Sequence, residues 1–409
     1  MGTIWRFYRD RSFILKMTVG FVLGIIAGLI FGPSAKVLSP LGELLLRLLN
    51  LIVIPLVVFT LIAAVDQLNP KKLGRIGGKI FIYYMFTTAV AIVFGIVVAL
   101  LVKPGAALSL PEAKVEVPEH SSMVDTLLGI VPENLFSSLV TNDVLGIIFV
   151  SVIAGLSISS MMHAGEERVR KMGEFLNDAT VSLSEVTFRI LGGILQYAPI
   201  GIFAIAASAI GTQGLKTLLS LGKLTAVIYI GIVLQFIFVY ILLMKIFGVQ
   251  IRKFFSDTKE AIATAFMTSS SLGTLPVTLR SASKAGISEE VASFGLPLGA
   301  TVNMDGAAIR LGASVVFAAD IMGLDLGFSA ILGIIVTGTL ASVGTAGVPG
   351  AGLIALSIVL TQAGLPIEVV ALVAGVDAIL GMGATACNVT GDLVGAAIVD
   401  RSERKGTMS

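Results

Sequence analysis

The chain has 409 residues, of which 56% are hydrophobic and only 13% are charged. Soluble domains carry about 25% charged residues and disordered chains have low hydrophobicity, so both classes are excluded. The mean hydropathy of +0.97 predicts a multi-spanning membrane protein. A formal net charge of +2 gives no nucleic-acid-binding footprint, and the lone Cys387 rules out an intramolecular disulfide.

The first 250 residues contain apolar runs of the length that spans a membrane, which is about 20 residues for a core of about 30 Å. In chain order they lie at 13–32, 41–65, 80–102, 127–160, 181–210 and 224–247. Basic residues before the first run and after the second favour a cytoplasmic position for both segments. The acidic stretch 103–125 is expected outside, and 166–171 is expected to be a charged connector.

The last third of the chain contains an internal repeat. Ser271–Pro276 and Ser342–Pro349 share a Ser-x-Gly-Thr core followed by proline, and each interrupts an apolar stretch. Each is followed by a helix in which a polar break is expected, at 303–306 and at 388–392. Close helix packing through Gly and Ser is one reading. Two matched interruptions favour the other, a transporter site built from broken helices.

Backbone that leaves a helix at membrane depth must be buried in protein or line a polar cavity. The freed amides can bind an anion and the freed carbonyls a cation.

Six stretches resemble the sodium:dicarboxylate symporter family, the dicarboxylate/amino acid:cation symporters, which includes prokaryotic aspartate and glutamate transporters. They are 51–59, 198–204, 268–276, 296–306, 342–352 and 388–392. The resemblance covers essentially the whole chain. It implies an all-α integral membrane protein with the elevator-type glutamate-transporter fold: eight transmembrane helices and two re-entrant helical hairpins arranged as inverted repeats. It further implies a homotrimeric transporter, not an enzyme, in the inner (plasma) membrane of a prokaryote, with both termini cytoplasmic.

The same resemblance divides the chain between a scaffold and a moving transport domain. Scaffold helices 1 and 2 would occupy 1–76, and transport-domain helix 3 would occupy 77–103. An external loop and scaffold helices 4 and 5 would follow in 104–213. The transport-domain core, with helix 6, hairpin 1, helix 7, hairpin 2 and helix 8, would occupy 214–409.

Two acidic residues lie in the expected breaks, Asp305 and Asp392. A carboxylate inside the membrane is a functional-site hypothesis because burying it is costly. The resemblance implies three sodium ions per protomer. One site would combine Asp392 with backbone oxygens of Gly299, Asn303 and Asn388. A second would use backbone oxygens of Thr301, Ser342, Val343 and Thr345. A third would use Asp305, the Asn303 side chain, Tyr84, Thr87 and Thr88.

The substrate site is expected along one face of the last helix, where residues 377, 381, 384, 385, 388 and 392 line up at helical spacing. The resemblance implies that Ser271, Thr385 and Asn388 hold the main carboxylate of the substrate. Ser270, Met304 and Val348 would complete the pocket. Four positions depart from the acidic amino acid transporters: Gly381 replaces an Asp, Ala384 an Arg, Ala307 a Thr, and Ser269 an occasional Arg.

Arg310 stands where relatives usually have an aromatic residue. An arginine at mid-helix costs about 2.5–3.5 kcal/mol on insertion scales, so a partner is expected. In relatives the aromatic packs against the arginine that Ala384 replaces, so Arg310 is expected beside Ala384. There it could bind a second carboxylate. An ion pair with Asp377 or Asp320, or snorkelling to an edge, is equally open.

These substitutions favour a small carboxylate without a paired amine, such as a C4 dicarboxylate. The alternative is a neutral amino acid whose amine is held by hairpin carbonyls. An acidic amino acid in the usual pose is disfavoured, because Gly381 offers no charge to an ammonium group. An ion channel with Ser-Val-Gly-Thr as a filter is the rival class.

Overall fold

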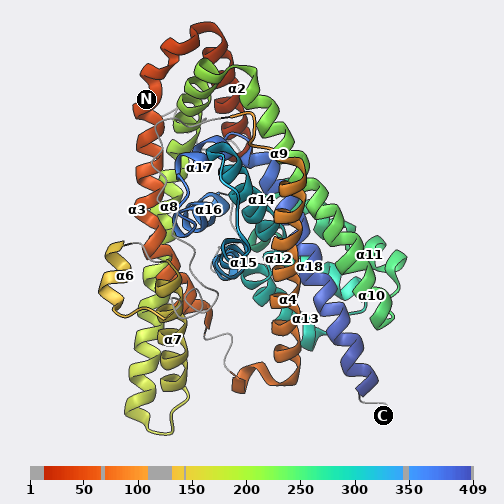
Figure 1. Cartoon of the computed structure of the whole chain (residues 1–409). Helices are drawn as coiled ribbons and strands as arrows, with labels where there is room; N and C mark the ends of the chain where they lie inside the picture. Colours follow the sequence, from red (N-terminus) through yellow and green to blue (C-terminus); the bar gives the residue numbers. More distant parts are fainter. Residues whose placement is uncertain (1–12, 66–69, 109–130, 142–143, 344–349, 407–409) are drawn as a thin grey trace, which may run out of the picture.

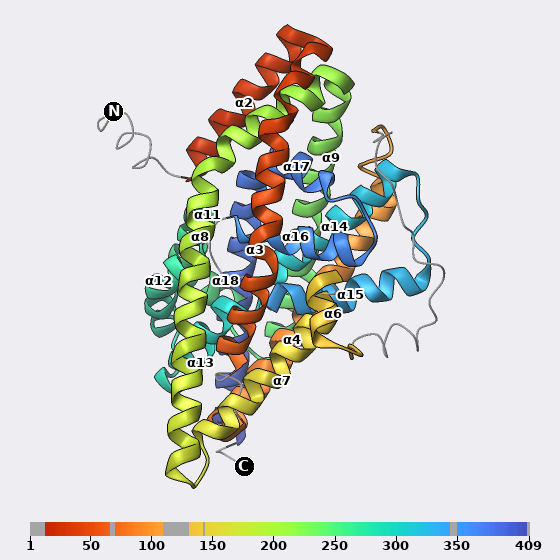
Figure 2. The ribbon, with the colours of Figure 1, turned by 90° about the vertical axis from the view of Figure 1, so that its left-hand side faces the viewer.

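The computed structural model describes residues 13–65, 70–108, 131–141, 144–343 and 350–406, and these are helical almost throughout. The helices sort into two packing groups, which lie side by side in Figure 1 and one in front of the other in Figure 2. The first group contains α2 (Phe13–Phe31), α3 (Ser39–Val65), α6 (Leu135–Thr141), α7 (Val144–Met162) and α8 (Glu167–Gln213), with the 3₁₀ turn η1 (Gly32–Leu38) joining α2 to α3.

Glycines let α2 and α8 approach closely. Gly20, Gly24 and Gly28 recur every four residues on α2 and face the backbone of α8. A β-carbon at Gly24 would lie 2.5 Å from the carbonyl oxygen of Phe203, and one at Gly20 would lie 2.5 Å from that of Pro199. Small residues at this spacing allow backbone contact between membrane helices, where packing rather than hydrophobicity drives association.

The second group holds the rest of the described chain. Its members are α4 (Pro70–Val102), α9 (Leu215–Leu234), the π-helix η3 (Gln235–Ile241), α10 (Leu242–Phe247), α11 (Ile251–Thr268), α12 (Ser271–Lys284), α13 (Glu289–Val302), α14 (Asp305–Met322), α15 (Phe328–Val343), α16 (Ala351–Gln362), α17 (Glu368–Ala374) and α18 (Asp377–Gly406).

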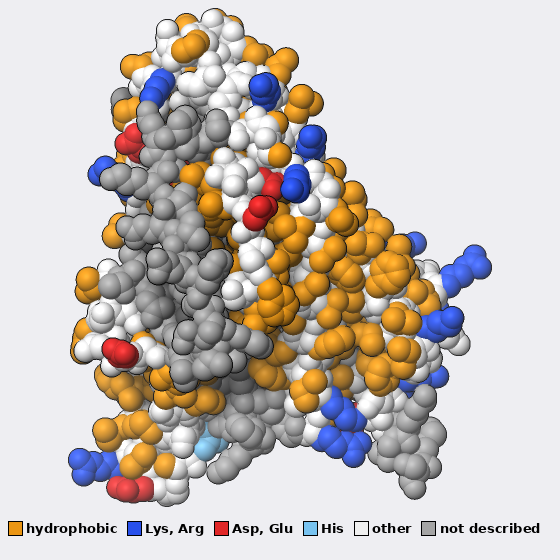
Figure 3. Space-filling model, in the orientation of Figure 1, with side chains coloured by type: hydrophobic (Ala, Val, Ile, Leu, Met, Phe, Trp, Pro, Cys, Tyr) orange, Lys and Arg blue, Asp and Glu red, His pale blue; other side chains and the backbone are white. Residues whose placement is uncertain are grey.

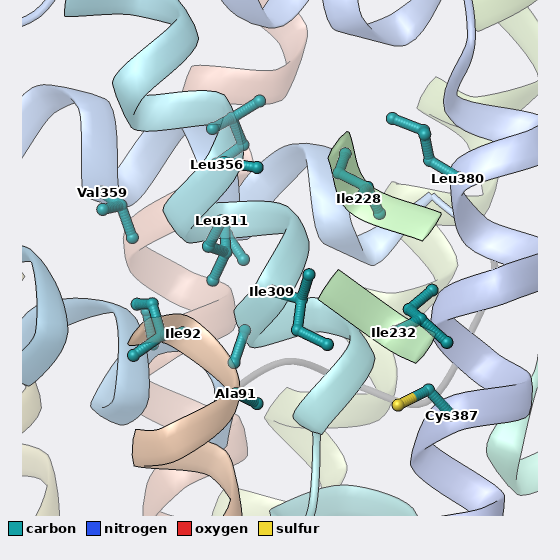
Figure 4. Packing of buried hydrophobic residues seen from close by; sticks show 14 of the residues in the cluster. Ala91, Ile92, Ile228, Ile232, Ile309, Leu311, Leu356, Val359, Leu380 and Cys387 are labelled. Atoms are coloured by element: carbon teal, nitrogen blue, oxygen red, sulfur yellow. The ribbon is translucent and has the colours of Figure 1, made fainter. Parts of the chain in front are cut away.

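Helix α14 is the centre of this group and contacts α4, α9, α15, α16 and α18. Its side chains are buried on every face. In Figure 4, Ile309 points toward Ile228 and Ile232 of α9, while Leu311 lies on the side of α4 and α16. A helix that is covered all round positions its polar side chains with little freedom, which suits it to carry a site.

The membrane prediction agrees with the outer surface. Within the described residues, five helices are long and apolar enough to cross a membrane by length and composition. They lie at Leu15–Ala63, Arg75–Val102, Glu167–Gln213, Leu215–Phe247 and Asp377–Arg404. Figure 3 shows a broad band of hydrophobic side chains, with lysine and arginine side chains gathered above and below it.

Two of the expected helix interruptions are present. One lies at Ser269 and Ser270, between α11 and α12, which pack against each other; the expected segment 271–276 itself forms the start of α12. The other lies at Asn303 and Met304, between α13 and α14. The tip expected around 343 coincides with the end of α15, and residues 344–349 lie outside the described residues.

The expected break at 388–392 is wrong, because α18 continues without interruption through these residues. The chain instead leaves the helix at Gly375 and Val376, between α17 and α18. Gly391 packs tightly, since a β-carbon there would lie 2.6 Å from Nδ2 of Asn303. The glycine of this motif therefore allows close packing and does not interrupt the helix.

The charged connector expected at 166–171 is also wrong. Helix α8 begins at Glu167 and runs for 47 residues. Its first turns carry ion pairs at the i, i+4 spacing, Lys171 with Glu167 at 2.8 Å and Arg170 with Glu174 at 3.7 Å. Such pairs stabilise an exposed helical segment, which explains why the charged residues extend the helix.

Replacing Gly24 with alanine is expected to destabilise the protein, because the added methyl group meets backbone and the Ala206 side chain. Overpacking of this kind costs about 1–3 kcal/mol. Gly193→Ala on α8 is the matched control, since its β-carbon would meet nothing within 4 Å. Thermal unfolding in detergent should show a lower Tm for Gly24→Ala alone. Equal Tm values for the two variants would contradict the close-packing argument.

Candidate functional site

The candidate site lies where the gap between α13 and α14 faces α18. Helices α14 and α18 run in opposite directions, as three contacts along them show. Nδ2 of Asn303 donates to Asp392 at 2.9 Å, and the amide of Gly306 donates to Oδ1 of Asn388 at 2.7 Å. One turn further along α14, Nη1 of Arg310 lies 2.7 Å from Oδ1 of Asp377. Most of the predicted site residues therefore line one seam between two helices.

The gap itself places polar groups at the start of α14. Asn303 (φ −92°, ψ 89°) and Met304 (φ −114°, ψ 48°) are not helical. Oδ1 of Asn388 accepts from the buried amide of Gly306, which lies in the first turn of the helix and needs a partner outside it. Nδ2 of Asn388 also donates to the sulfur of Met304 at 3.1 Å. Asp305 occupies the first position of α14, where the helix dipole favours a negative charge.

The Asp305 carboxylate is buried and accepts hydrogen bonds from four neutral side chains. The hydroxyls of Thr87 and Thr88 donate to Oδ1 at 3.2 and 2.8 Å. Nε2 of Gln235 donates to Oδ2 at 3.0 Å and the Tyr240 hydroxyl at 2.6 Å. The predicted grouping of Asp305 with Thr87 and Thr88 thus matches the distances, while Gln235 and Tyr240 are additional partners that the sequence did not reveal.

The π-helix η3 explains the contribution of Gln235 and Tyr240. These residues are five positions apart, which separates side chains by about 140° on an α-helix with 3.6 residues per turn. The wider π turn brings them to the same side, and π-helical turns are frequent at functional sites. Two polar groups within the apolar run 224–247 were the available sequence signal, but regular α-helical spacing separates them.

Asn303 connects the two buried carboxylates. Its Oδ1 accepts from the Thr87 hydroxyl at 3.2 Å, and its Nδ2 donates to Oδ1 of Asp392. Gly299 adjoins this group, since a β-carbon there would lie 2.5 Å from Oδ1 of Asp392 and 2.7 Å from the Tyr84 hydroxyl. The Tyr84 hydroxyl donates to the carbonyl of Gly295 at 2.9 Å. It therefore lies by Gly299 on the side of Asp392, whereas the resemblance groups Tyr84 with Asp305.

The second predicted cation site is less fully described. The hydroxyl of Thr301 donates to Leu298 at 3.0 Å and that of Ser342 to Thr339 at 2.7 Å, both within their own helices. Val343 ends α15, and α13 and α15 are in contact. Thr345 lies outside the described residues, as does Val348 of the predicted substrate site.

Around Gly381 there is space for a side chain. Its nearest neighbours are the side-chain atoms of Ser269, at 3.7 Å or more from an ideal β-carbon. Ser269 adopts a left-handed conformation (φ 51°), and its buried hydroxyl has no hydrogen-bond partner. Ser270 caps α12 by accepting from the amide of Gly273 at 3.0 Å. Ser271 and Thr385 are buried, and Gly306 rests on the backbone of Ala384.

Arg310 forms a buried ion pair with Asp377, with side-chain exposures of 5% and 4%. Asp320, the other acid considered, accepts from the amide of Gly105 at 3.1 Å. Of the possibilities left open by the sequence, the ion pair with Asp377 is therefore present. In the described part of the chain, Nη2 of Arg310 has no hydrogen-bond partner, and a contact between Arg310 and a ligand stays a prediction.

The seam has the chemistry of a cation site. Asp305 and Asp392 hydrogen-bond to neutral donors, and no ion pair joins either of them to a basic side chain in the described part of the chain. Buried charges need compensation, and hard cations prefer oxygen ligands. Within the described ranges, no group of three or more His, Cys, Asp or Glu residues could hold a metal ion. A cation at this seam would therefore be bound by the two carboxylates together with amide, hydroxyl and carbonyl oxygens.

The sequence is similar to those of known proteins over almost its whole length. Residues 13–402 match the family model described as "Sodium:dicarboxylate symporter family". The chain is 35% identical to a proton/sodium-glutamate symport protein of Bacillus caldotenax, over 95% of this chain and 94% of the relative. It is 32% identical to human excitatory amino acid transporter 3, over 99% and 88%. It is 30% identical to a C4-dicarboxylate transport protein of Bacillus subtilis, over 97% and 94%.

These relatives are membrane transporters of small carboxylate substrates and not enzymes. Bacterial relatives and the apolar helices agree with a multi-pass protein of the plasma membrane. The chain belongs to the sodium:dicarboxylate symporter family.

Proposed function

We propose that this symporter couples the uptake of a small carboxylate-bearing solute, preferentially a C4 dicarboxylate, to the binding of sodium ions. The observation that carries the proposal is the buried hydrogen-bonded series Asp305–Thr87–Asn303–Asp392, which lies at a helix gap and contains two acids and no base. The negative charges of this group would be compensated by bound cations. Because the group lies beside the predicted substrate face, cation binding and ligand binding would be coupled.

Three sodium ions are proposed, held by the residues named from the family resemblance. Asp305 with Thr87 and Thr88, and Asp392 with Gly299, are the sets whose closeness supports two of these sites. Bound sodium would supply positive charge to a buried carboxylate. Asn303 contacts both sets, so occupation of one site would orient the amide that serves the other.

The substrate proposal rests on which charges line the seam. Ser271, Thr385 and Asn388 are proposed to hold the main carboxylate, and Nη2 of Arg310 supports a place for a second one. At Gly381 the helix offers neither charge nor side chain to an ammonium group. A dicarboxylate carries no ammonium group and does carry a second carboxylate, so it fits both observations.

A neutral amino acid is the second candidate, and the ion pair between Arg310 and Asp377 favours it. Because Asp377 compensates the guanidinium, the pair as a whole presents no net charge to the far end of a ligand. A ligand with a short uncharged side chain would then bind without a second carboxylate. The C4-dicarboxylate relative matches the first candidate, whereas the glutamate relatives carry an acidic amino acid.

Movement is proposed to follow the two packing groups. Helices α2, α3, α7 and α8 would form a static, trimerising scaffold, and the group around α14 would carry the substrate across as an elevator. The pairs α11–α12 and α15–α16 would be the re-entrant hairpins. The close glycine contact between α2 and α8 supports a rigid scaffold, and both termini are proposed to be cytoplasmic.

Substituting Asp392 with asparagine should abolish most of the stabilisation by sodium. The side chain is 1% exposed and bonds to Asn303, so loss of its charge removes the attraction for a cation. Sodium that binds the folded state raises Tm by linkage. We expect the apparent sodium affinity to fall at least about tenfold, or about 1.4 kcal/mol. Asp325→Asn, at an exposed position, is the control, and equal sodium responses would contradict the assignment.

The substrate class can be tested by uptake into proteoliposomes. Wild-type protein should take up radiolabelled succinate when a sodium gradient points inward, with saturation, and not when potassium replaces sodium. Alanine, serine and glutamate, added as competitors, rank the alternatives. Competition by alanine or serine without competition by succinate would replace the first candidate with the second. Sodium current with no saturable dependence on any of these solutes would sink the symporter proposal.

A further inference from the structure

The ion pair between Arg310 and Asp377 has an open side. Arginine and carboxylate groups often pair through two parallel hydrogen bonds. Here Nη1 of Arg310 lies 2.7 Å from Oδ1 of Asp377 as an ion pair, and among the described residues neither that oxygen nor the buried Nη2 has a hydrogen-bond partner. An unpaired buried donor is costly, which singles out this edge of the guanidinium as a place where an acceptor would bind.

Gly352 on α16 makes room for that open edge. A β-carbon at position 352 would overlap Nη2 of Arg310 and crowd the rest of the guanidinium. The guanidinium therefore lies between Gly352 on one side and the first turn of α18 on the other. Three elements, α14, α16 and α18, meet at one charged group, and only a residue without a side chain fits beside it.

The open edge lies close to the predicted substrate face. Gly306 rests on the backbone of Ala384, and Arg310 follows one turn later on α14. Asp377, its partner, lies one turn before Gly381 on the antiparallel α18. The Gly306–Ala384 and Arg310–Asp377 contacts therefore lie on either side of Gly381 along α18, where the nearest side chain is that of Ser269, whose hydroxyl has no hydrogen-bond partner among the described residues.

We propose that Asp377 determines which ligand charge this site accepts, by holding one half of Arg310 and leaving the other half to the far end of the ligand. The inference rests on the proposed function, because it concerns the same ligand. Asp377 and a distal ligand carboxylate would share one guanidinium, each on its own nitrogen. Asp377 would therefore act as a resident competitor that weakens the preference for a second negative charge.

The proposal makes position 377 a specificity-determining position. With the negative charge of Asp377 removed, the full charge of Arg310 faces the ligand, and repulsion between two carboxylates disappears. Asp377→Asn keeps the shape and an oxygen acceptor for Nη1 but leaves the buried charge of Arg310 uncompensated, so it is expected to be less stable. Gly352→Ala acts sterically, because the added methyl group displaces Nη2 without changing any charge.

The test compares ligands that differ only at one end. Succinate and succinamate differ by one carboxylate exchanged for an amide, as do glutamate and glutamine. Dissociation constants would be measured by calorimetry in detergent at saturating sodium, for the wild type and each variant. The readout is the affinity ratio of acid to amide within whichever pair the wild type binds. Asp320→Asn is the matched control. It removes an acid from α14, the helix that carries Arg310, at a position that accepts from the amide of Gly105.

We expect Asp377→Asn to raise the acid-to-amide ratio about tenfold, and Gly352→Ala to lower it to near one. Arg310→Met combined with Asp377→Asn removes the pair without leaving a buried charge, which avoids misfolding, and should also bring the ratio near one. Asp320→Asn should leave it unchanged. Sodium-induced thermal stabilisation should persist in all variants and shows that they are folded.

Two failures are distinguishable. If the wild type binds one pair but Asp377→Asn leaves its ratio unchanged, the inference is overturned and the proposed function stands. If the wild type binds neither pair in sodium, the proposed function falls and takes the inference with it. A ratio that changes equally in Asp320→Asn would show a general charge effect and would also overturn the assignment to Asp377.

Discussion

The burial of two carboxylates without a basic partner is the constraint on which the rest of the site depends. Asp305 and Asp392 lie in the interior of a helical protein that is apolar outside, where an unpaired charge is expensive. Four neutral donors from two elements, α4 and η3, converge on Asp305, and Asn303 connects the Thr87 hydroxyl to Asp392. The gap between α13 and α14, the π turn in η3 and the glycine at position 299 all serve to bring oxygen and amide groups to these two side chains.

Glycine has two different structural roles in this membrane protein. At Gly24 and Gly352 it allows backbone or a guanidinium to come closer than a side chain permits. At Gly381 a β-carbon would meet only the Ser269 side chain, at ordinary contact distance. Composition alone treats these residues alike, yet one kind allows close contact and the other leaves room for a small side chain. The high glycine content is therefore explained partly by packing and partly by the site.

The sequence indicated which residues would come together at the candidate site better than it indicated where the surrounding helices begin and end. Charges are so rare in the apolar runs that Asp305, Arg310 and Asp392 stand out, and the Asn-Met-Asp-Gly stretch predicts the observed gap at Asn303. The similar stretch at 388–392 misled, because whether glycine and asparagine interrupt a helix depends on which neighbours can satisfy the freed backbone. The start of α8 was missed because charged residues were taken as a connector, although their i, i+4 ion pairs stabilise a helix.

The partners of a charge were the hardest feature to foresee, since they are set by contacts between distant elements. Gln235 and Tyr240 belong to a run that reads as an ordinary apolar helix, and the pairing of Arg310 with Asp377 spans 67 residues of sequence. Periodicity describes one helix at a time. It carries no information on where a second helix places its acid, so the sequence left several partners for Arg310 open.

The π turn in η3 also has a consequence for how this helix tolerates change. Each residue advances an α-helix by about 100°, and a π turn accommodates one residue more than a regular turn. Forcing the present sequence between 235 and 241 into regular α-helical geometry would turn Tyr240 away from Asp305. Deleting one residue between Gln235 and Tyr240 would instead leave them four positions apart, and a regular α-helix places such side chains within about 40° of each other. Here the irregular form of the helix is the one that completes the site.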